Sequence, residues 1–177
     1  AYILKHAGVR TVLTSTPAQL RKVLACRDGC PDLRHVVVFD PPVDPPRGVQ
    51  SLDQVVARST TVDPATVREA GLAARTDDPA TVMYTSGTTG TPKGILFTHR
   101  NIVFKRFCRA LAIPEIGEDD VFLSYLPLFH TFGRWFEMFG AVFWGATYCF
   151  LENPSVEALV AGMRKYRPTV FISVPKK

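Results

Sequence analysis

A run of seven glycine, serine and threonine residues, 85–91, lies between two strongly apolar segments. If these three residue types make up roughly a fifth of an average sequence, chance produces such a run in on the order of one window in 10^5. The run supplies hydroxyl groups from Thr85, Ser86, Thr88, Thr89 and Thr91. Hydroxyls and free backbone amides in a short loop are suited to hydrogen-bonding the oxygens of a polyphosphate.

Glycines and a lysine complete this segment. Gly87, Gly90 and Gly94 have no Cβ to hold a ligand away from the backbone. Lys93 adds a positive charge, and Pro92 before it fixes φ and so reduces the freedom that ligand binding removes. An ordinary hairpin rich in turn residues, or a flexible linker, is the alternative. The shortness of the loop, the strand patterns at both of its ends and the lysine directly after proline favour phosphate binding.

Two common phosphate-binding motifs are absent. The spacing G-x4-G-K-[ST] fails because the fifth residue after Gly87 is Pro92, and no G-x-G-x-x-G is present. The loop therefore belongs to neither a P-loop NTPase nor a dinucleotide-binding fold.

Two motifs, in order along the chain, resemble a known family. YTSGTTGTPKG, which ends at Gly94, resembles the signature phosphate loop of the AMP-forming adenylate-forming enzymes, which include acyl-CoA synthetases, peptide synthetase adenylation domains and luciferases. LPLFHTFGR, which ends at Arg134, resembles the LPL-x-H segment of that family in its long-chain acyl-CoA synthetase version. That version usually has glutamate where Gly133 stands. With RPTVFISVP and the opening AYILKHAGVRTVLTS, the resemblance spans nearly the whole chain.

The resemblance implies a two-step reaction. Enzymes of this family bind ATP with Mg2+, and a carboxylate attacks the α-phosphate to give an acyl-adenylate and pyrophosphate. The acyl group then passes to a thiol, usually that of coenzyme A. The residues that the resemblance places at the nucleotide are Thr85, Ser86, Gly87, Thr88, Thr89, Gly90, Thr91, Lys93 and Gly94, and those it makes catalytic are Lys93, Thr88 and His130. It assigns no metal ligand to this chain.

The second motif leaves alternatives open. His130 lies between two phenylalanines and is either a core residue or, as the resemblance implies, the residue that faces the reacting carboxylate and phosphates. Arg134 either contacts a phosphate or pairs with Glu137 at i, i+3. The aromatic residues that follow either line an acyl tunnel or pack in the core: Trp135, Phe136, Phe139, Phe143 and Trp144.

Strand and helix patterns alternate along the chain, which predicts an α/β fold with a mainly parallel sheet flanked by helices. The expected strands are residues 10–15, 35–39, 80–85, 94–98, 121–126, 147–151 and 169–174, the last one buried. The expected helices are residues 18–25, 52–57, a segment opened by Thr98, a segment from Phe132, and residues 156–166. The helix after Thr98 is expected to turn Ile102, Val103, Phe107 and Leu111 inward. The proline-rich segment 40–48 and a polar link to residue 78 mark a soft internal boundary.

Residues 1–177 are expected to be part of the large N-terminal domain of the acyl-CoA synthetase-like fold. The chain begins inside a helix-like pattern and ends directly behind an expected strand, so we expect a piece of a larger protein. The small C-terminal domain and the remaining nucleotide-binding residues would then lie downstream, and this segment alone would be inactive.

Composition indicates which kinds of partner and which cellular location to expect. The net charge is +5, but the basic residues are spread singly along the chain, which argues against nucleic acid. Two of the four cysteines lie in apolar segments, and no set has the spacing of a metal site, which favours reduced thiols in the cytoplasm. The uncharged stretch 138–151 is too short to cross a bilayer, whereas peripheral membrane association stays open.

The sequence thus favours a fatty acyl-CoA synthetase that uses a carboxylic acid, ATP and coenzyme A. One alternative is an acyl-AMP ligase or an adenylation domain that passes its acyl group to a carrier protein. Another is a catalytically incomplete module that binds phosphate.

Overall fold

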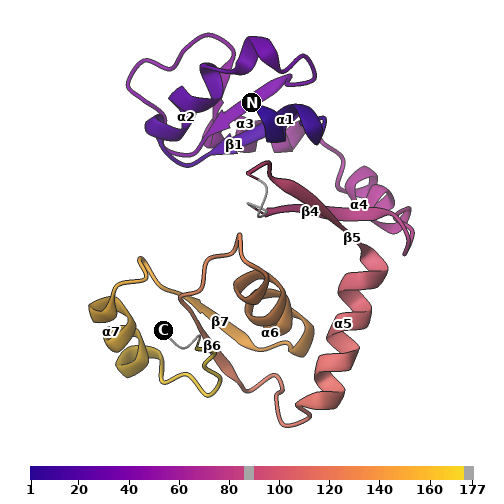
Figure 1. Ribbon diagram of the computed structural model, residues 1–177, viewed down its shortest axis with the longest axis vertical. Coiled ribbons are helices and arrows are strands. Elements are labelled where there is room, and N and C mark those ends of the chain that lie inside the picture. Colours follow the sequence, from indigo (N-terminus) through magenta and orange to yellow (C-terminus); the bar gives the residue numbers. More distant parts are fainter. Residues whose placement is uncertain (86–89, 174–177) are drawn as a thin grey trace. The chain divides into compact units, whose positions relative to one another are not determined.

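The computed structural model describes residues 1–85 and 90–173. The chain divides into two compact units (Figure 1). The first contains Ala1–Arg75 and Val82–Leu96, and the second contains Thr76–Thr81 and Phe97–Lys177.

The first unit is built on a three-stranded parallel sheet in the order β1-β2-β3. Its strands are β1 (Thr11–Thr14), β2 (His35–Val38) and β3 (Val49–Ser51), and its helices are α1 (Tyr2–His6), α2 (Pro17–Leu24), α3 (Leu52–Ala57) and α4 (Pro64–Leu72), with short 3-10 turns η1 (Arg27–Gly29) and η2 (Arg58–Thr61). The core cluster consists of Leu20, Cys30, Leu33, Val36, Val38 and Val49. The strand and helix patterns from residue 10 to residue 57 therefore form the expected elements, with ends that differ by a residue or two.

Side-chain caps explain where the helices of this unit begin. Thr16 accepts a hydrogen bond from the backbone N–H of Gln19 at the start of α2, and Ser51 forms a capping box with Gln54 at the start of α3. Asp63 caps α4, whose first residue is Pro64. The prediction of a polar link up to residue 78 is wrong at this point, because the link contains α4.

The strands β4 (Pro79–Thr85) and β5 (Lys93–Thr98) pair with each other on either side of the hydroxyl-rich loop. Figure 1 shows them as a hairpin that leads into α5 (His99–Ala112). Thr98 caps α5 through a capping box with Asn101, as its position before the apolar pattern predicts.

In the second unit, β6 (Val121–Ser124) pairs in parallel with β7 (Thr147–Phe150). A π-helix η3 (Phe132–Met138) continues directly into α6 (Phe139–Trp144), which ends at Gly145 with φ of +74°, and α7 (Val156–Tyr166) follows β7. Phe122, Leu123, Trp135 and Ala141 form the buried apolar centre. The expected mainly parallel α/β organisation is confirmed.

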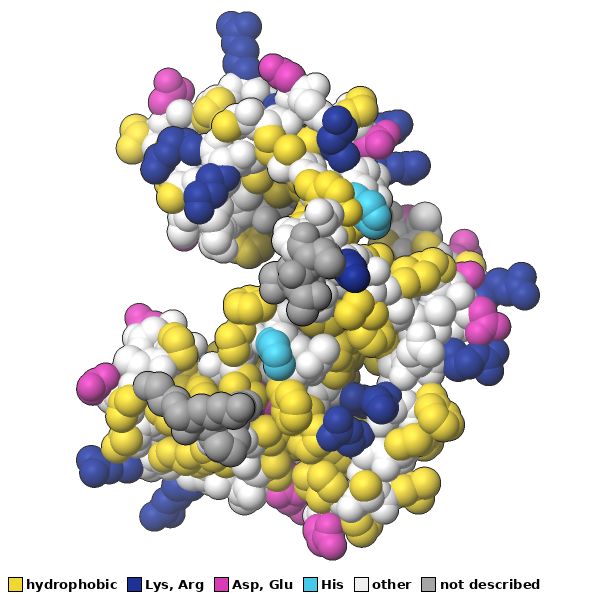
Figure 2. Space-filling model, viewed as in Figure 1, with side chains coloured by type: hydrophobic (Ala, Val, Ile, Leu, Met, Phe, Trp, Pro, Cys, Tyr) yellow, Lys and Arg dark blue, Asp and Glu magenta, His cyan; other side chains and the backbone are white. Residues whose placement is uncertain are grey.

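Two expectations about this unit are wrong. Of the four residues expected to turn inward on α5, Ile102 is half-buried, but Val103, Phe107 and Leu111 are 52%, 57% and 84% exposed. The buried residue of this helix is Arg106. An apolar period shows which face of a helix is apolar, but not that another element covers it. Hydrophobic side chains accordingly occupy much of the visible surface of the second unit (Figure 2).

The chain after Arg167 is not the buried strand that its apolar pattern suggests. Within its described part, to Ser173, it forms only an isolated bridge between Val170 and Phe122, and Phe171 is 38% exposed. Among the described residues, no helix combines the length and the apolar character needed to span a bilayer.

Candidate active site

The hairpin β4–β5 positions the predicted phosphate loop. Thr85 is the last residue of β4 and Lys93 the first residue of β5, and both side chains are exposed. Gly90 has φ of +81°, a left-handed conformation that favours glycine. Thr91, which lies between Gly90 and Lys93, is also exposed. The remaining predicted loop residues lie outside the described part of the chain: Ser86, Gly87, Thr88 and Thr89.

Gly94 has a packing reason to be glycine. A Cβ at this position would lie 3.1 Å from Cγ1 of Val82 and 3.2 Å from Cζ of Tyr84. The backbone of β5 therefore approaches the Tyr84 ring closely, and a larger residue would push the two strands apart beside the loop.

Tyr84 is held in turn by the first helix. Its hydroxyl lies 2.6 Å from Nδ1 of His6, and the two rings meet edge to face with centroids 5.7 Å apart. This contact fixes the end of β4 from which the loop departs. Sequence reasoning did not select His6, because it lies 78 positions from Tyr84.

His130 lies in the segment between β6 and η3 and is exposed, so the alternative of a buried core histidine is wrong. Its backbone N–H donates to the carbonyl of Pro127 at 2.9 Å, and its Nδ1 accepts from the backbone N–H of Phe132 at 3.4 Å. Because a neutral imidazole that accepts at Nδ1 has its proton at Nε2, the outer nitrogen is a hydrogen-bond donor. The loop and His130 belong to different units.

Arg134 fixes the shape of this segment from the first turn of η3. Its Nε donates to the carbonyl of Leu128 at 2.8 Å, and its backbone N–H donates to the carbonyl of His130 at 3.1 Å. Of the two alternatives for Arg134, the pair with Glu137 is not formed, since Glu137 is buried and 1% exposed.

Glu137 is instead part of a buried polar chain. The hydroxyl of Tyr148 lies 3.4 Å from Oε2 of Glu137 and 2.9 Å from Oγ of Ser124. Oε1 of Glu137 has no hydrogen-bond partner. Burial raises the pKa of Glu137 to about 7, a shift that the hydrogen bond from Tyr148 partly opposes.

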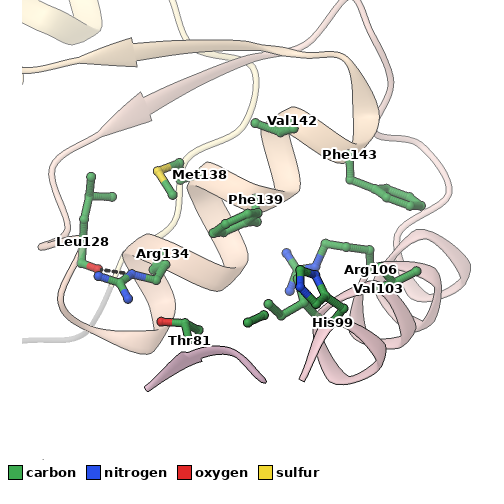
Figure 3. A pocket seen from close by; sticks show the side chains of 12 residues that line it. Thr81, His99, Val103, Arg106, Leu128, Arg134, Met138, Phe139, Val142 and Phe143 are labelled. Carbon is green, nitrogen blue, oxygen red and sulfur yellow. Dashed lines mark hydrogen bonds between the residues drawn. The ribbon is translucent and has the colours of Figure 1, made fainter. Parts of the chain in front are cut away.

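A cavity of about 660 Å³ lies beside α5, η3 and α6 (Figure 3). Of the five aromatic residues proposed from the sequence, Phe139 and Phe143 line it. Trp135 is buried and stacks on Phe139 with centroids 5.3 Å apart, so at this residue the prediction of core packing holds. Arg106 also lines the cavity, although the sequence gave no sign that it is buried.

The chain belongs to the AMP-binding enzyme family, whose model matches residues 1–176. It is 33% identical over 190 residues to acyl-CoA ligase 891, peroxisomal, of Penicillium brevicompactum, and 32% identical over 178 residues to long chain acyl-CoA synthetase 6, peroxisomal, of Arabidopsis thaliana. Both alignments cover 99% of this chain. They cover 26% and 25% of those relatives, so the chain spans about a quarter of their length.

Solved structures show the same fold. The anthranilate CoA ligase AuaEII in complex with anthranoyl-AMP superposes with a TM-score of 0.76 and 25% identity, over 96% of this chain and 32% of that chain. A benzoate CoA ligase from Burkholderia xenovorans LB400 superposes with a TM-score of 0.70 and 26% identity, over 96% of this chain and 31% of that chain. The fold is therefore that of the adenylate-forming ligases.

Proposed function

We propose that this chain is part of a longer AMP-forming ligase, within its large N-terminal domain. A carboxylate oxygen of the substrate attacks the α-phosphorus of ATP, the bond to pyrophosphate breaks, and an acyl-adenylate forms. The thiol sulfur of coenzyme A then attacks the acyl carbon and AMP leaves. Family membership and the ligase relatives support this proposal. The observation on which it depends is the hydroxyl-rich hairpin loop with Lys93 at the start of β5.

The loop acts by positioning and by electrostatic stabilisation. The hydroxyls and amides of residues 85–91, with Thr88 among them, and the Lys93 ammonium bind the β- and γ-phosphates and stabilise the departing pyrophosphate. His130 donates from Nε2 to the reacting carboxylate or phosphate, because its Nδ1 is already an acceptor within the chain.

Magnesium accompanies ATP in this proposal, and the resemblance assigns none of its ligands to this chain. No group of three or more His, Cys, Asp or Glu side chains among the described residues is suited to a metal ion. We assign the contribution of this chain to charge stabilisation to the loop and Lys93.

The proposed acid is a fatty acid. A long-chain synthetase is among the relatives, and the cavity beside α5 and α6 has mainly apolar walls. Coenzyme A is the proposed acceptor, since the relatives named above are CoA ligases and synthetases. The proposed location is the cytoplasm, with peripheral attachment to a membrane as an option.

Exchange of labelled pyrophosphate into ATP by the full-length protein, with and without a carboxylic acid, tests the proposal. We expect acid-dependent exchange without any thiol, and a decrease of about 10^2 to 10^3 in rate for Lys93→Ala, because a preorganised donor to the developing charge is lost. Lys22→Ala, which removes an exposed lysine of α2, is the matched control and should exchange at the normal rate.

Near-normal exchange in Lys93→Ala would contradict the role assigned to the loop. In a second experiment, coenzyme A is added to the enzyme that holds the acyl-adenylate. Release of acyl-CoA supports an acyl-CoA ligase, whereas a stable acyl-adenylate indicates that the acyl group passes to a carrier protein instead.

A further inference from the structure

Arg106 is a buried arginine with two unpartnered nitrogens. It lies in the middle of α5, is 4% exposed, and points into the cavity of the second unit (Figure 3). Its Nε and Nη1 have no hydrogen-bond partner. Among the described residues, no salt bridge to a carboxylate is found at Arg106.

Such an arrangement is unfavourable unless an anion completes it. Removing a charged group from water is strongly unfavourable when no opposite charge compensates it. Burial is the main cause that lowers the pKa of Arg106, and the nearby charge of Arg109 lowers it further. The direction of this shift reflects the same cost of holding the charge away from water. The guanidinium presents N–H donors in a planar fork that matches the two oxygens of a carboxylate.

The other residues that line the cavity indicate the chemical character of the rest of the ligand. The apolar lining comes from α5 and α6 and includes Val103, Phe139 and Phe143. Of the residues that the structure describes, the ionisable side chains in the lining are His99, Arg134 and Arg106, with no carboxylate among them. The Nε of Arg134 already donates a hydrogen bond to the carbonyl of Leu128. A volume of about 660 Å³ lies within the range of small-molecule sites. These walls fit a carboxylate attached to a hydrocarbon better than a hydrophilic anion such as phosphate.

We propose that this cavity binds a carboxylate joined to a hydrocarbon segment, and that Arg106 anchors the carboxylate. The ligand has two sources: the far end of a dicarboxylic acid that the enzyme activates, or a fatty acid bound apart from the reaction. The first source rests on the proposed function, whereas binding itself does not.

Binding is tested by calorimetry on the full-length protein with dodecanoate and with dodecanol, which lacks the carboxylate. We expect dodecanoate to bind the unaltered protein at least about 10-fold more tightly than dodecanol, since a hydrogen-bonded charge contact contributes that much or more. Arg106→Met should remove this preference and Arg106→Lys should retain part of it. Arg164→Met, an exposed arginine of α7, should retain all of it.

Arg106→Met is expected to fold, because it removes an uncompensated buried charge and keeps an apolar side chain of similar length. If it does not fold, Arg106→Lys, which keeps the charge but not the planar fork, takes its place, and a weakened preference for dodecanoate is then the expected result. Equal affinity for dodecanoate and dodecanol, or an unchanged preference in folded Arg106→Met, would overturn the proposal. An unchanged preference in folded Arg106→Met would indicate that an acidic side chain elsewhere in the full-length protein forms the ion pair with Arg106.

Kinetics distinguish the two sources. If the cavity holds the far end of the substrate, Arg106→Met loses about 10-fold or more in kcat/KM with dodecanedioate and little with dodecanoate. If the fatty acid binds separately, one binding event disappears while kcat/KM is unchanged for both acids. Absence of pyrophosphate exchange with every acid would refute the proposed function and leave the binding result standing.

Discussion

Glu137 shows how one buried side chain can set the pH dependence of stability. Its pKa is raised from 4.5 to about 7, with burial as the main cause. Between these two values the folded protein holds a proton that the unfolded chain has released, so stability decreases as the pH rises from about 4.5 to about 7. Above that range the carboxylate is charged in both states. Burying it there lowers the free energy of unfolding by roughly 3 kcal/mol.

We therefore predict that Glu137→Gln makes the full-length protein more stable above pH 7, by up to about 3 kcal/mol. Glutamine resembles the protonated acid and can still accept the hydrogen bond from Tyr148. Urea unfolding from pH 5 to pH 8 measures the effect as the difference between the variant and the unaltered protein. Glu157→Gln on the exposed side of α7 is the control. The same pH slope in both variants would show that Glu137 does not titrate in this range.

At the scale of elements, the start of the π-helix η3 depends on Gly133. A Cβ there would lie 2.6 Å from the carbonyl oxygen of Pro127 and 2.7 Å from that of Leu126. Both are backbone atoms, so the segment that holds His130 would have to move. The glycine that departs from the long-chain synthetase pattern is thus required by the local packing of this chain.

Gly133→Ala is expected to destabilise the full-length protein by about 1 to 3 kcal/mol through overpacking. Because the backbone N–H of His130 bonds to Pro127, we also expect a lower rate of acid-dependent pyrophosphate exchange. Gly71→Ala is the matched control: its Cβ meets nothing within 4 Å and lies in α4, where alanine is the better helix former. If both variants unfold at the same urea concentration, the close approach at Gly133 is not a constraint.

The sequence predicted elements best where caps and period agree. Residues 156–166 form α7 as expected, and Ser155 caps it. The helix α4 was missed although Asp63 and Pro64 are a typical helix start, because its surroundings are polar. The burial of α5 was predicted wrongly because periodicity cannot show which neighbouring elements pack on a helix. The same limit hid the burial of Arg106, which lies against Gly140 of α6.

At the scale of the whole molecule, the motifs indicated the hairpin and the segment around His130, and the structure shows the strands and turns that hold them. The motifs could not indicate His6, since the hydrogen bond to Tyr84 joins residues far apart in the sequence. They also could not indicate the chain from Glu137 through Tyr148 to Ser124, because each member comes from a different element. Long-range contacts of this kind depend on topology rather than on local pattern.

The division into two compact units leads to a last prediction. Val38 is fully buried in a core cluster whose members all belong to the first unit. Val38→Ala should therefore destabilise that unit by roughly 2 to 3 kcal/mol, the sum of the lost burial and the cavity left behind. Hydrogen exchange on the full-length protein measures this as faster exchange of the amides of β1, β2 and β3, with β6 and β7 as the internal reference. Val43→Ala, in the exposed loop before β3, is the matched control and should leave every amide unchanged. Equal acceleration in β6 and β7 would show instead that both units unfold in one cooperative step.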